Sequence, residues 1–129
     1  MGVIVYNPLA GGVLSGKYRA GQAVVDGSRF DLPIAGKMYQ QRYWEDRKLE
    51  ISQQLAEESK NRDLSPVSVA VAWTLAQPGI TSAIIGATRP DQLDANIAGA
   101  GLTLDEDLMA LCDSIWWQLP RTPIIEGYR

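Results

Sequence analysis

The sequence of 129 residues is long enough for one domain with a hydrophobic core, and its 12 basic and 15 acidic residues leave a net charge of −3. It has neither the Lys/Arg stripe that binds a phosphate backbone nor an apolar run of the roughly 20 residues that cross a bilayer, so nucleic acid and membranes are not expected partners. With one cysteine and no histidine, the chain can form neither an internal disulfide nor a zinc cluster, and we expect a cytoplasmic protein without a metal site.

The first half of the sequence predicts a strand, a long loop and a helix. Residues 2–6 form a short run rich in β-branched side chains that ends at Asn7-Pro8. Such a run is typical of a fully buried strand in a parallel sheet. Residues 7–41 are rich in glycine and proline and predict a long loop, and loops of this length usually carry function. Between Tyr43 and Arg62, the apolar residues recur on one helical face, which predicts a single amphipathic surface helix.

The second half predicts three helices and another strand. A largely buried helix runs from Ser65-Pro66 to Leu75, and a buried strand over 81–85 follows a break at Pro78-Gly79. The next helix covers 91–98 and is closed by Gly99 and Gly101. The last helix begins at a Thr103–Glu106 capping box and ends at Ile115. Cys112 lies at helical spacing from Leu108 and Leu111, so we expect a core thiol. Two strands leave both outer edges unpaired, and we expect strands from the rest of the protein or from another copy to complete the sheet.

The loop after the first strand carries a glycine-rich segment with one lysine, from Tyr6 to Tyr18. Glycines let backbone N–H groups approach an anion, and Lys17 adds a compact positive charge, so the segment suits a phosphate ligand. The alternative is a turn-rich connection with a solvated lysine. The segment from Gly11 to Lys17 matches the start of a nucleotide-triphosphate loop, but Tyr18 stands where that motif needs a small hydroxyl on Mg²⁺, and we reject this interpretation.

The second strand runs into the start of a helix at residues 86–90. Free N–H groups and the helix dipole favour an anion there, with Thr88 and Arg89 as hydroxyl and guanidinium partners. Gln92 and Asn96 lie one turn apart, so both amides could address one planar ligand. Alternatively, Thr88 only caps the helix and the two amides are surface residues. Since both loops follow parallel strands, we expect them to face the same side and to hold a ligand with two separated phosphate groups.

At these two segments the sequence resembles the aldo-keto reductase superfamily, in particular the branch that includes the potassium-channel β-subunits. The resemblance covers essentially the whole chain and implies an α/β fold, in which residues 1–129 form the C-terminal, NADP-binding part of a (β/α)8 TIM barrel with two βα units plus extra helices. A complete barrel takes roughly 250 residues, so the domain would be incomplete. The implied activity of the intact protein is hydride transfer between NADPH and an aldehyde or ketone substrate.

The resemblance also implies which residues hold the NADP cofactor. The ring of Tyr6 would stack on the nicotinamide, the backbone from Asn7 to Gly11 and Lys17 would bind the pyrophosphate, and Arg29 would close over the cofactor. The second segment would hold the adenosine end, with Thr88 and Arg89 near the 2′-phosphate. The full set of implied cofactor-binding residues is Tyr6, Asn7, Pro8, Leu9, Ala10, Gly11, Lys17, Arg29, Gly86, Thr88, Arg89, Gln92 and Asn96.

The family's catalytic Asp, Tyr, Lys and His belong to an earlier part of the barrel, and the resemblance places none of them in this chain. We therefore expect no catalytic residue here and no turnover by the chain alone. The alternative function is a non-catalytic nicotinamide-binding or regulatory subunit. Trp116, Trp117 and Tyr128 could border a substrate pocket, although aromatic residues near a C-terminus pack on a barrel wall more often.

Overall fold

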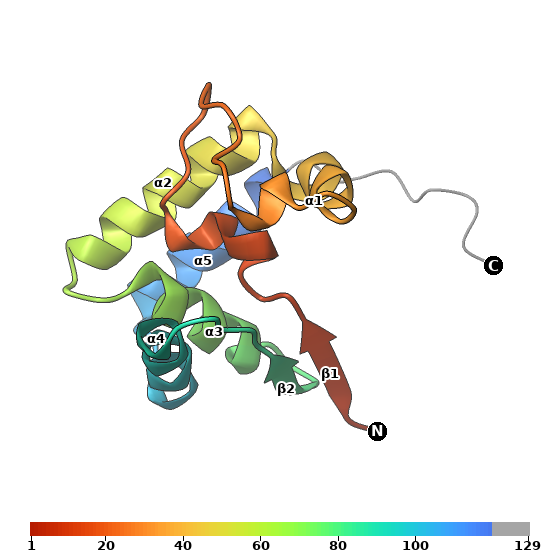
Figure 1. Ribbon diagram of the computed structural model, residues 1–129. Helices are drawn as coiled ribbons and strands as arrows, with labels where there is room; N and C mark the ends of the chain where they lie inside the picture. Colours follow the sequence, from red (N-terminus) through yellow and green to blue (C-terminus); the bar gives the residue numbers. More distant parts are fainter. Residues whose placement is uncertain (120–129) are drawn as a thin grey trace.

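The computed structural model describes residues 1–119. Its elements are β1 (Val3–Tyr6), the 3-10 helices η1 (Ala10–Ser15) and η2 (Arg29–Asp31), α1 (Gly36–Tyr43), α2 (Asp46–Lys60), α3 (Pro66–Ala76), β2 (Ile80–Ile84), α4 (Pro90–Gly101) and α5 (Glu106–Gln118). Figure 1 shows the two strands side by side at one edge of the molecule, with the helices gathered on one side of them. The predicted α/β class is confirmed, and both strands begin within one residue of their predicted positions.

The two strands pair in parallel, but they are not buried as predicted. The register places Tyr6 opposite Ile84 and Ile4 opposite Ser82, so these side chains share one face of the sheet. Ile4, Tyr6 and Ile84 are 66%, 71% and 59% exposed. The expectation of fully buried strands is therefore wrong for residues 1–119, because α3 packs on one side of the sheet and no described element covers the other.

The single helix predicted from Tyr43 to Arg62 is two helices, and part of the predicted loop over 7–41 is helical. The break falls at Trp44 and Glu45, where the backbone is extended between α1 and α2. The indole of Trp44 packs against Phe30 and Tyr18, with ring centroids 4.8 and 5.0 Å apart. The turn lets this ring pack against Tyr18 and Phe30, while Ile51 and Leu55 of α2 enter a different cluster.

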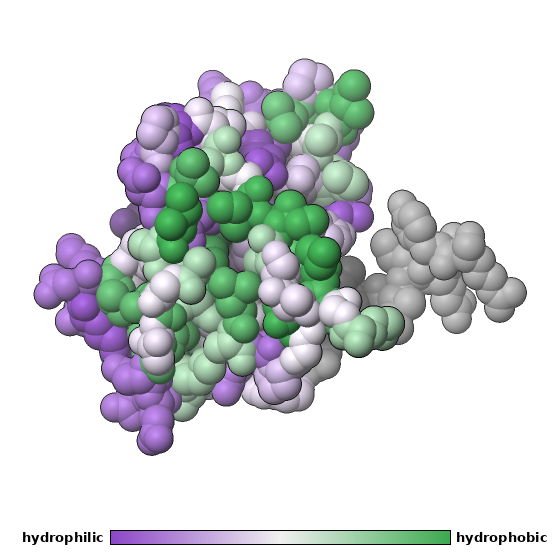
Figure 2. Space-filling model, turned by 90° about the horizontal axis from the view of Figure 1, so that it is seen from below, coloured by the Kyte–Doolittle hydropathy of each residue, from purple (hydrophilic) through white to green (hydrophobic). Residues whose placement is uncertain are grey.

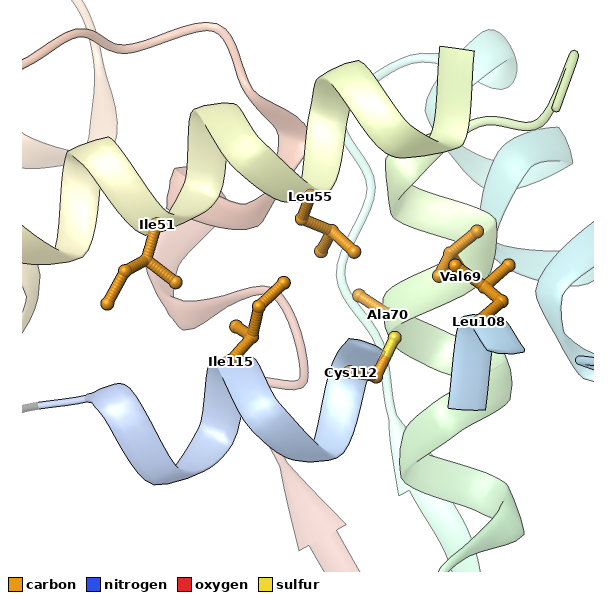
Figure 3. Packing of buried hydrophobic residues seen from close by; sticks show 7 residues of the cluster. All are labelled: Ile51, Leu55, Val69, Ala70, Leu108, Cys112 and Ile115. Carbon is orange, nitrogen blue, oxygen red and sulfur yellow. The ribbon is translucent and has the colours of Figure 1, made fainter. Parts of the chain in front are cut away.

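The interior consists of two hydrophobic clusters. The larger one joins α2, α3 and α5, whose side chains converge in Figure 3: Ile51, Leu55, Val69, Ala70, Leu108, Cys112 and Ile115. The smaller one lies beneath η1 and η2 and consists of Val13, Tyr18, Phe30 and Leu49. The prediction of a largely buried α3 is confirmed, and so is that of a core thiol. Burial raises the pKa of Cys112 to about 11, so this thiol stays protonated at neutral pH.

The helix ends differ from several predicted ones. Ser65 is the N-cap residue of α3 as predicted, although its side chain makes no capping bond. The Thr103–Glu106 capping box is wrong, because Asp105 caps α5 and its Oδ1 accepts from the backbone N of Leu108 at 2.8 Å. Gly99 does not close α4, since the helix continues to Gly101.

Gly99 allows the close approach of α4 to α3. A Cβ at Gly99 would lie 2.7 Å from the carbonyl oxygen of Ser68 and 2.8 Å from Cβ of Val71, which is too close for either to remain in place. We expect Gly99→Ala to lower the free energy of unfolding of the full-length gene product by about 1–3 kcal/mol through overpacking. Gly101→Ala is the matched control, because a Cβ there meets nothing within 4 Å. Chemical denaturation measures both, and equal effects of the two substitutions would contradict this account of the α3–α4 contact.

Candidate functional site

The loops that follow β1 and β2 line one groove of about 620 Å³. The expectation that the two segments face the same side is confirmed. The groove is lined by every residue of the implied cofactor set except Ala10: Tyr6, Asn7, Pro8, Leu9, Gly11, Lys17, Arg29, Gly86, Thr88, Arg89, Gln92 and Asn96. Ala10 lines a neighbouring apolar cavity instead.

Three consecutive backbone N–H groups of the loop after β1 are bonded within the loop. The backbone N of Ala10 donates to the carbonyl oxygen of Asn7 at 3.0 Å, and that of Gly12 donates to Leu9 at 2.9 Å. The backbone N of Gly11 donates to Oδ1 of Asn7 at 2.9 Å. Asn7 adopts φ 61°, a conformation that asparagine tolerates better than most residues. These three N–H groups are thus engaged inside the loop, and the cationic group that the loop offers to an anion is its lysine.

Lys17 extends along the loop toward the groove. Its Nζ lies 4.9 Å from the ring centroid of Tyr18, and its Cε would lie 3.9 Å from a Cβ at Gly12. A Cβ at this distance would make only ordinary van der Waals contact, so the lysine stem runs alongside Gly12 without crowding it. Tyr18 is itself a core residue, so its ring is committed to packing. This burial agrees with the rejection of a nucleotide-triphosphate loop.

The loop after β2 is held by contacts among its own side chains. Arg89 binds Asp91 in a bidentate pair, with Nε–Oδ1 and Nη2–Oδ2 distances of 3.0 and 2.9 Å. Both side chains are exposed, and the hydrogen bond from Arg89 lowers the pKa of Asp91. The backbone N and Oγ1 of Thr88 both donate to Oε1 of Gln92, at 2.9 and 3.1 Å. Arg89 rather than Thr88 is the N-cap residue of α4.

Asn96 and Ser28 place buried polar atoms beside the groove. Asn96 is buried, so the alternative of a surface amide is wrong for this residue, and its Nδ2 donates to the carbonyl oxygen of Gln92 at 2.7 Å. Among residues 1–119, Oδ1 of Asn96 and Oγ of Ser28 are the buried side-chain oxygens that have no hydrogen-bond partner. Both residues line the groove. No pattern in the sequence had singled out Ser28.

Arg29 connects the long loop to the far wall of the groove. Its Nη1 donates to Oη of Tyr39 at 3.3 Å, and its guanidinium carbon lies 5.4 Å from the centroid of that ring. A Cβ at Gly86 would lie 3.8 Å from Nη2 of Arg29, so the guanidinium faces the segment after β2. Tyr39 is a second residue that sequence reasoning missed, because residues 36–41 of α1 fell within the predicted loop.

A larger apolar cavity of about 930 Å³ adjoins the groove and shares Tyr6, Asn7 and Pro8 with it. Trp116 and Trp117 line this cavity, and Trp116 also packs against Trp73 with ring centroids 5.8 Å apart. Figure 2 shows apolar residues gathered across the face seen from below in the view of Figure 1. Tyr128, the third aromatic residue considered for a substrate pocket, lies outside the described residues.

Two other kinds of site are absent from residues 1–119. No group of three His, Cys, Asp or Glu side chains in this range could hold a metal ion. Within the same range, each helix is too short or too polar to span a membrane.

The comparisons with known proteins agree with the resemblance noted in the sequence. The family model of the aldo/keto reductases matches residues 1–117. A putative voltage-gated potassium channel subunit beta of Schizosaccharomyces pombe is 31% identical in a match of 131 positions, which covers 99% of this chain and 37% of the relative. An uncharacterized oxidoreductase of Bacillus subtilis, YrpG, is 29% identical over 90% of this chain and 32% of the relative.

A probable voltage-gated potassium channel subunit beta of Arabidopsis thaliana is 33% identical over 75% of this chain and 29% of the relative. The chain thus spans about a third of the length of the curated relatives that it matches. The family match extends over both strands, both loops of the groove and nearly all of α5. The chain belongs to the aldo/keto reductase family.

Proposed function

We propose that this chain is the cofactor-holding, C-terminal part of an NADPH-dependent oxidoreductase of the cytoplasm. The intact protein would transfer hydride between NADPH and an aldehyde or ketone. One observation carries the proposal: two loops, each following a strand of the same parallel pair, together line one groove that contains the cationic side chains of Lys17, Arg29 and Arg89. Such a groove suits a dinucleotide that carries its negative charge at two separate places.

The polar atoms of the groove fit a dinucleotide of this kind. An unpaired buried polar atom costs about 1–3 kcal/mol, and a ligand that supplies its missing partner offsets that cost. The hydroxyl of Ser28 could donate to a phosphate oxygen, and Oδ1 of Asn96 could accept from an amino group of a base. The groove volume of about 620 Å³ lies within the range of small-molecule pockets.

The chain's own residues would bind and orient the cofactor, which supplies the hydride when it is bound. Tyr6 ends β1 at the junction of the groove and the apolar cavity, and its exposed ring is free to stack on a nicotinamide. Lys17 and Arg29 would bind the pyrophosphate. Thr88 and Arg89, at the start of α4, would bind the 2′-phosphate. The apolar cavity beside Tyr6 is lined by residues of α3 and α5, on the side of the sheet that the helices cover. The substrate would therefore not need to bind in this cavity.

The proposal includes the barrel to which the two strands would belong. β1 and β2 would be neighbouring strands of a (β/α)8 barrel, with Ile4, Tyr6 and Ile84 facing the barrel interior. The strands that flank this pair would come from the rest of the protein or from another copy. Either source would cover the exposed face and pair the two free edges.

A second candidate function is a nicotinamide-binding regulatory subunit without turnover. The observation in its favour is that two of the similar proteins are named as potassium channel subunits. The two candidates share the cofactor site and differ in turnover.

Titration of the full-length gene product with NADPH, followed by the fluorescence of the reduced cofactor, tests the shared site. We expect saturable binding, and we expect Lys17→Met to raise the dissociation constant about three- to tenfold, because it removes an exposed charge from the anion site. Lys60→Met, at the end of α2, is the matched control and should leave binding unchanged. Absence of binding by the unaltered protein would overturn the proposal. Carbonyl-dependent oxidation of NADPH then separates the enzyme from the regulatory subunit.

A further inference from the structure

We propose that Tyr39 and Tyr43, one turn apart on α1, are positioning residues for the groove. Each hydroxyl holds one groove residue in place: that of Tyr39 holds Arg29, and that of Tyr43 holds Asn7. The inference rests on the proposed function, because it assigns these tyrosines a role in binding the nicotinamide cofactor. It adds residues from a helix that neither motif contains.

Tyr43 orients the side-chain amide of Asn7. Nδ2 of Asn7 donates to Oη of Tyr43 at 2.9 Å, while Oδ1 of Asn7 accepts from the backbone N of Gly11 at 2.9 Å. The amide thus bridges α1 and the loop after β1, with one end on each. The backbone N–H of Gly11 can only donate, so it directs Oδ1 of Asn7 to the loop and leaves Nδ2 to donate to the tyrosine hydroxyl, which anchors that end of the amide on α1. In this way Tyr43 supports the left-handed conformation of Asn7 and the path of the loop as far as Gly11.

Tyr39 holds the guanidinium of Arg29 over the groove. Arg29 belongs to η2, a helix of three residues that cannot by itself restrain a long side chain. The hydroxyl of Tyr39 accepts from Nη1 at 3.3 Å, and its ring lies under the guanidinium carbon at 5.4 Å. Tyr39 in turn packs edge-on against the fully buried Phe30 at 6.4 Å, which anchors it in the smaller core. A ligand anion would thus meet an arginine that has already lost much of its rotamer freedom.

The two tyrosines form one surface against the loop. Their rings lie 6.1 Å apart with an interplanar angle of 36°. A Cβ at Gly11 would lie 3.1 Å from Cδ1 of Tyr39 and 3.4 Å from Cδ2 of Tyr43, so the backbone of Gly11 rests on both rings. The packing of α1 therefore determines where Asn7 and Arg29 stand relative to each other, although they are 22 positions apart in the sequence.

Hydroxyl deletion tests the proposal, because phenylalanine keeps both rings and their packing. In fluorescence titrations of the full-length gene product with NADPH, Tyr43→Phe and Tyr39→Phe should each raise the dissociation constant about two- to tenfold. A double-mutant cycle shows through which residue each tyrosine acts. Tyr43→Phe should add less than about twofold in an Asn7→Gly background, which keeps the positive φ. Tyr39→Phe should likewise add less than about twofold in an Arg29→Leu background.

A hydroxyl deletion outside the groove serves as the control. Thr74→Val removes a bond of 2.8 Å from Oγ1 to the carbonyl oxygen of Ala70 within α3, and it should lower the unfolding midpoint without changing the dissociation constant. Unchanged binding by both tyrosine variants would overturn the inference while leaving the proposed function in place. Full additivity in both cycles would do the same, since it would mean that the tyrosines act only through general stability. Failure of the unaltered protein to bind NADPH would overturn both proposals.

Discussion

The isolated chain of 129 residues is expected to self-associate rather than to form a monomer that unfolds cooperatively. Within residues 1–119 the sheet has two strands, so each strand has one unpaired edge, and the face of the sheet opposite α3 exposes Ile4, Tyr6 and Ile84. Open edges pair with other chains, and apolar patches of this kind associate in water. The apolar cavity beside β1 adds to the apolar surface that association would bury.

Size-exclusion chromatography with light scattering and a thermal unfolding scan measure this outcome. Ile4→Lys combined with Ile84→Lys should reduce the association of the isolated chain, because the two charges stand on the exposed face of the sheet. Ile34→Lys is the matched control: Ile34 is 94% exposed but lies in a loop, and its replacement should leave the association unchanged. A monomer with one cooperative transition would refute the expectation.

The positions of the strands could be predicted from the sequence, but their burial could not. The apolar runs that end at Asn7-Pro8 and begin after Pro78-Gly79 located both strands, because these dipeptides punctuate the chain. Continuous apolar character predicts coverage on both faces. Residues 1–119 cover only one face of the sheet. The apolar side chains of Ile4 and Ile84 on the other face are therefore explained by packing that these residues do not provide.

The break between α1 and α2 depends on contacts that a periodic pattern does not contain. Trp44 fits the apolar face of a continuous helix from Tyr43 to Arg62, and the helical period alone therefore favours one helix. The indole instead packs with Tyr18 and Phe30, which reach it from the loop that precedes α1. Tertiary packing overrides the local preference at this point.

The candidate site was predicted in part. The motifs located both loops, because each of the two segments follows a strand and parallel strands end on the same side. Tyr39, Tyr43 and Ser28 were missed, since their relation to the groove arises from the packing of α1 and η2. The spacing of the two tyrosines, four residues apart, was the available signal, but it has meaning only once residues 36–43 are read as a helix.

Arg89→Gln is expected to raise the dissociation constant for NADPH about ten- to hundredfold while changing that for NADH less than about twofold. The guanidinium stands at the start of α4, where the positive end of the helix also favours a phosphate. Glutamine keeps much of the stem but loses the charge and the bidentate geometry. Because NADH lacks the 2′-phosphate, it should not sense the change. Titrations of the full-length gene product with both nucleotides measure this selectivity.

A substitution of Asp91 tests the same phosphate site in the opposite direction, because the carboxylate of Asp91 competes with the phosphate for Arg89. The bidentate pair occupies Nε and Nη2 of the arginine, and the lowered pKa of Asp91 keeps the carboxylate charged at neutral pH. Asp91→Asn should therefore strengthen NADPH binding about two- to fivefold, the opposite direction to Arg89→Gln, by releasing the guanidinium and removing a like charge. The control is Asp94→Asn on the same helix, which should change neither titration. Equal losses of NADPH and NADH affinity in Arg89→Gln would mean that this arginine does not recognise the 2′-phosphate.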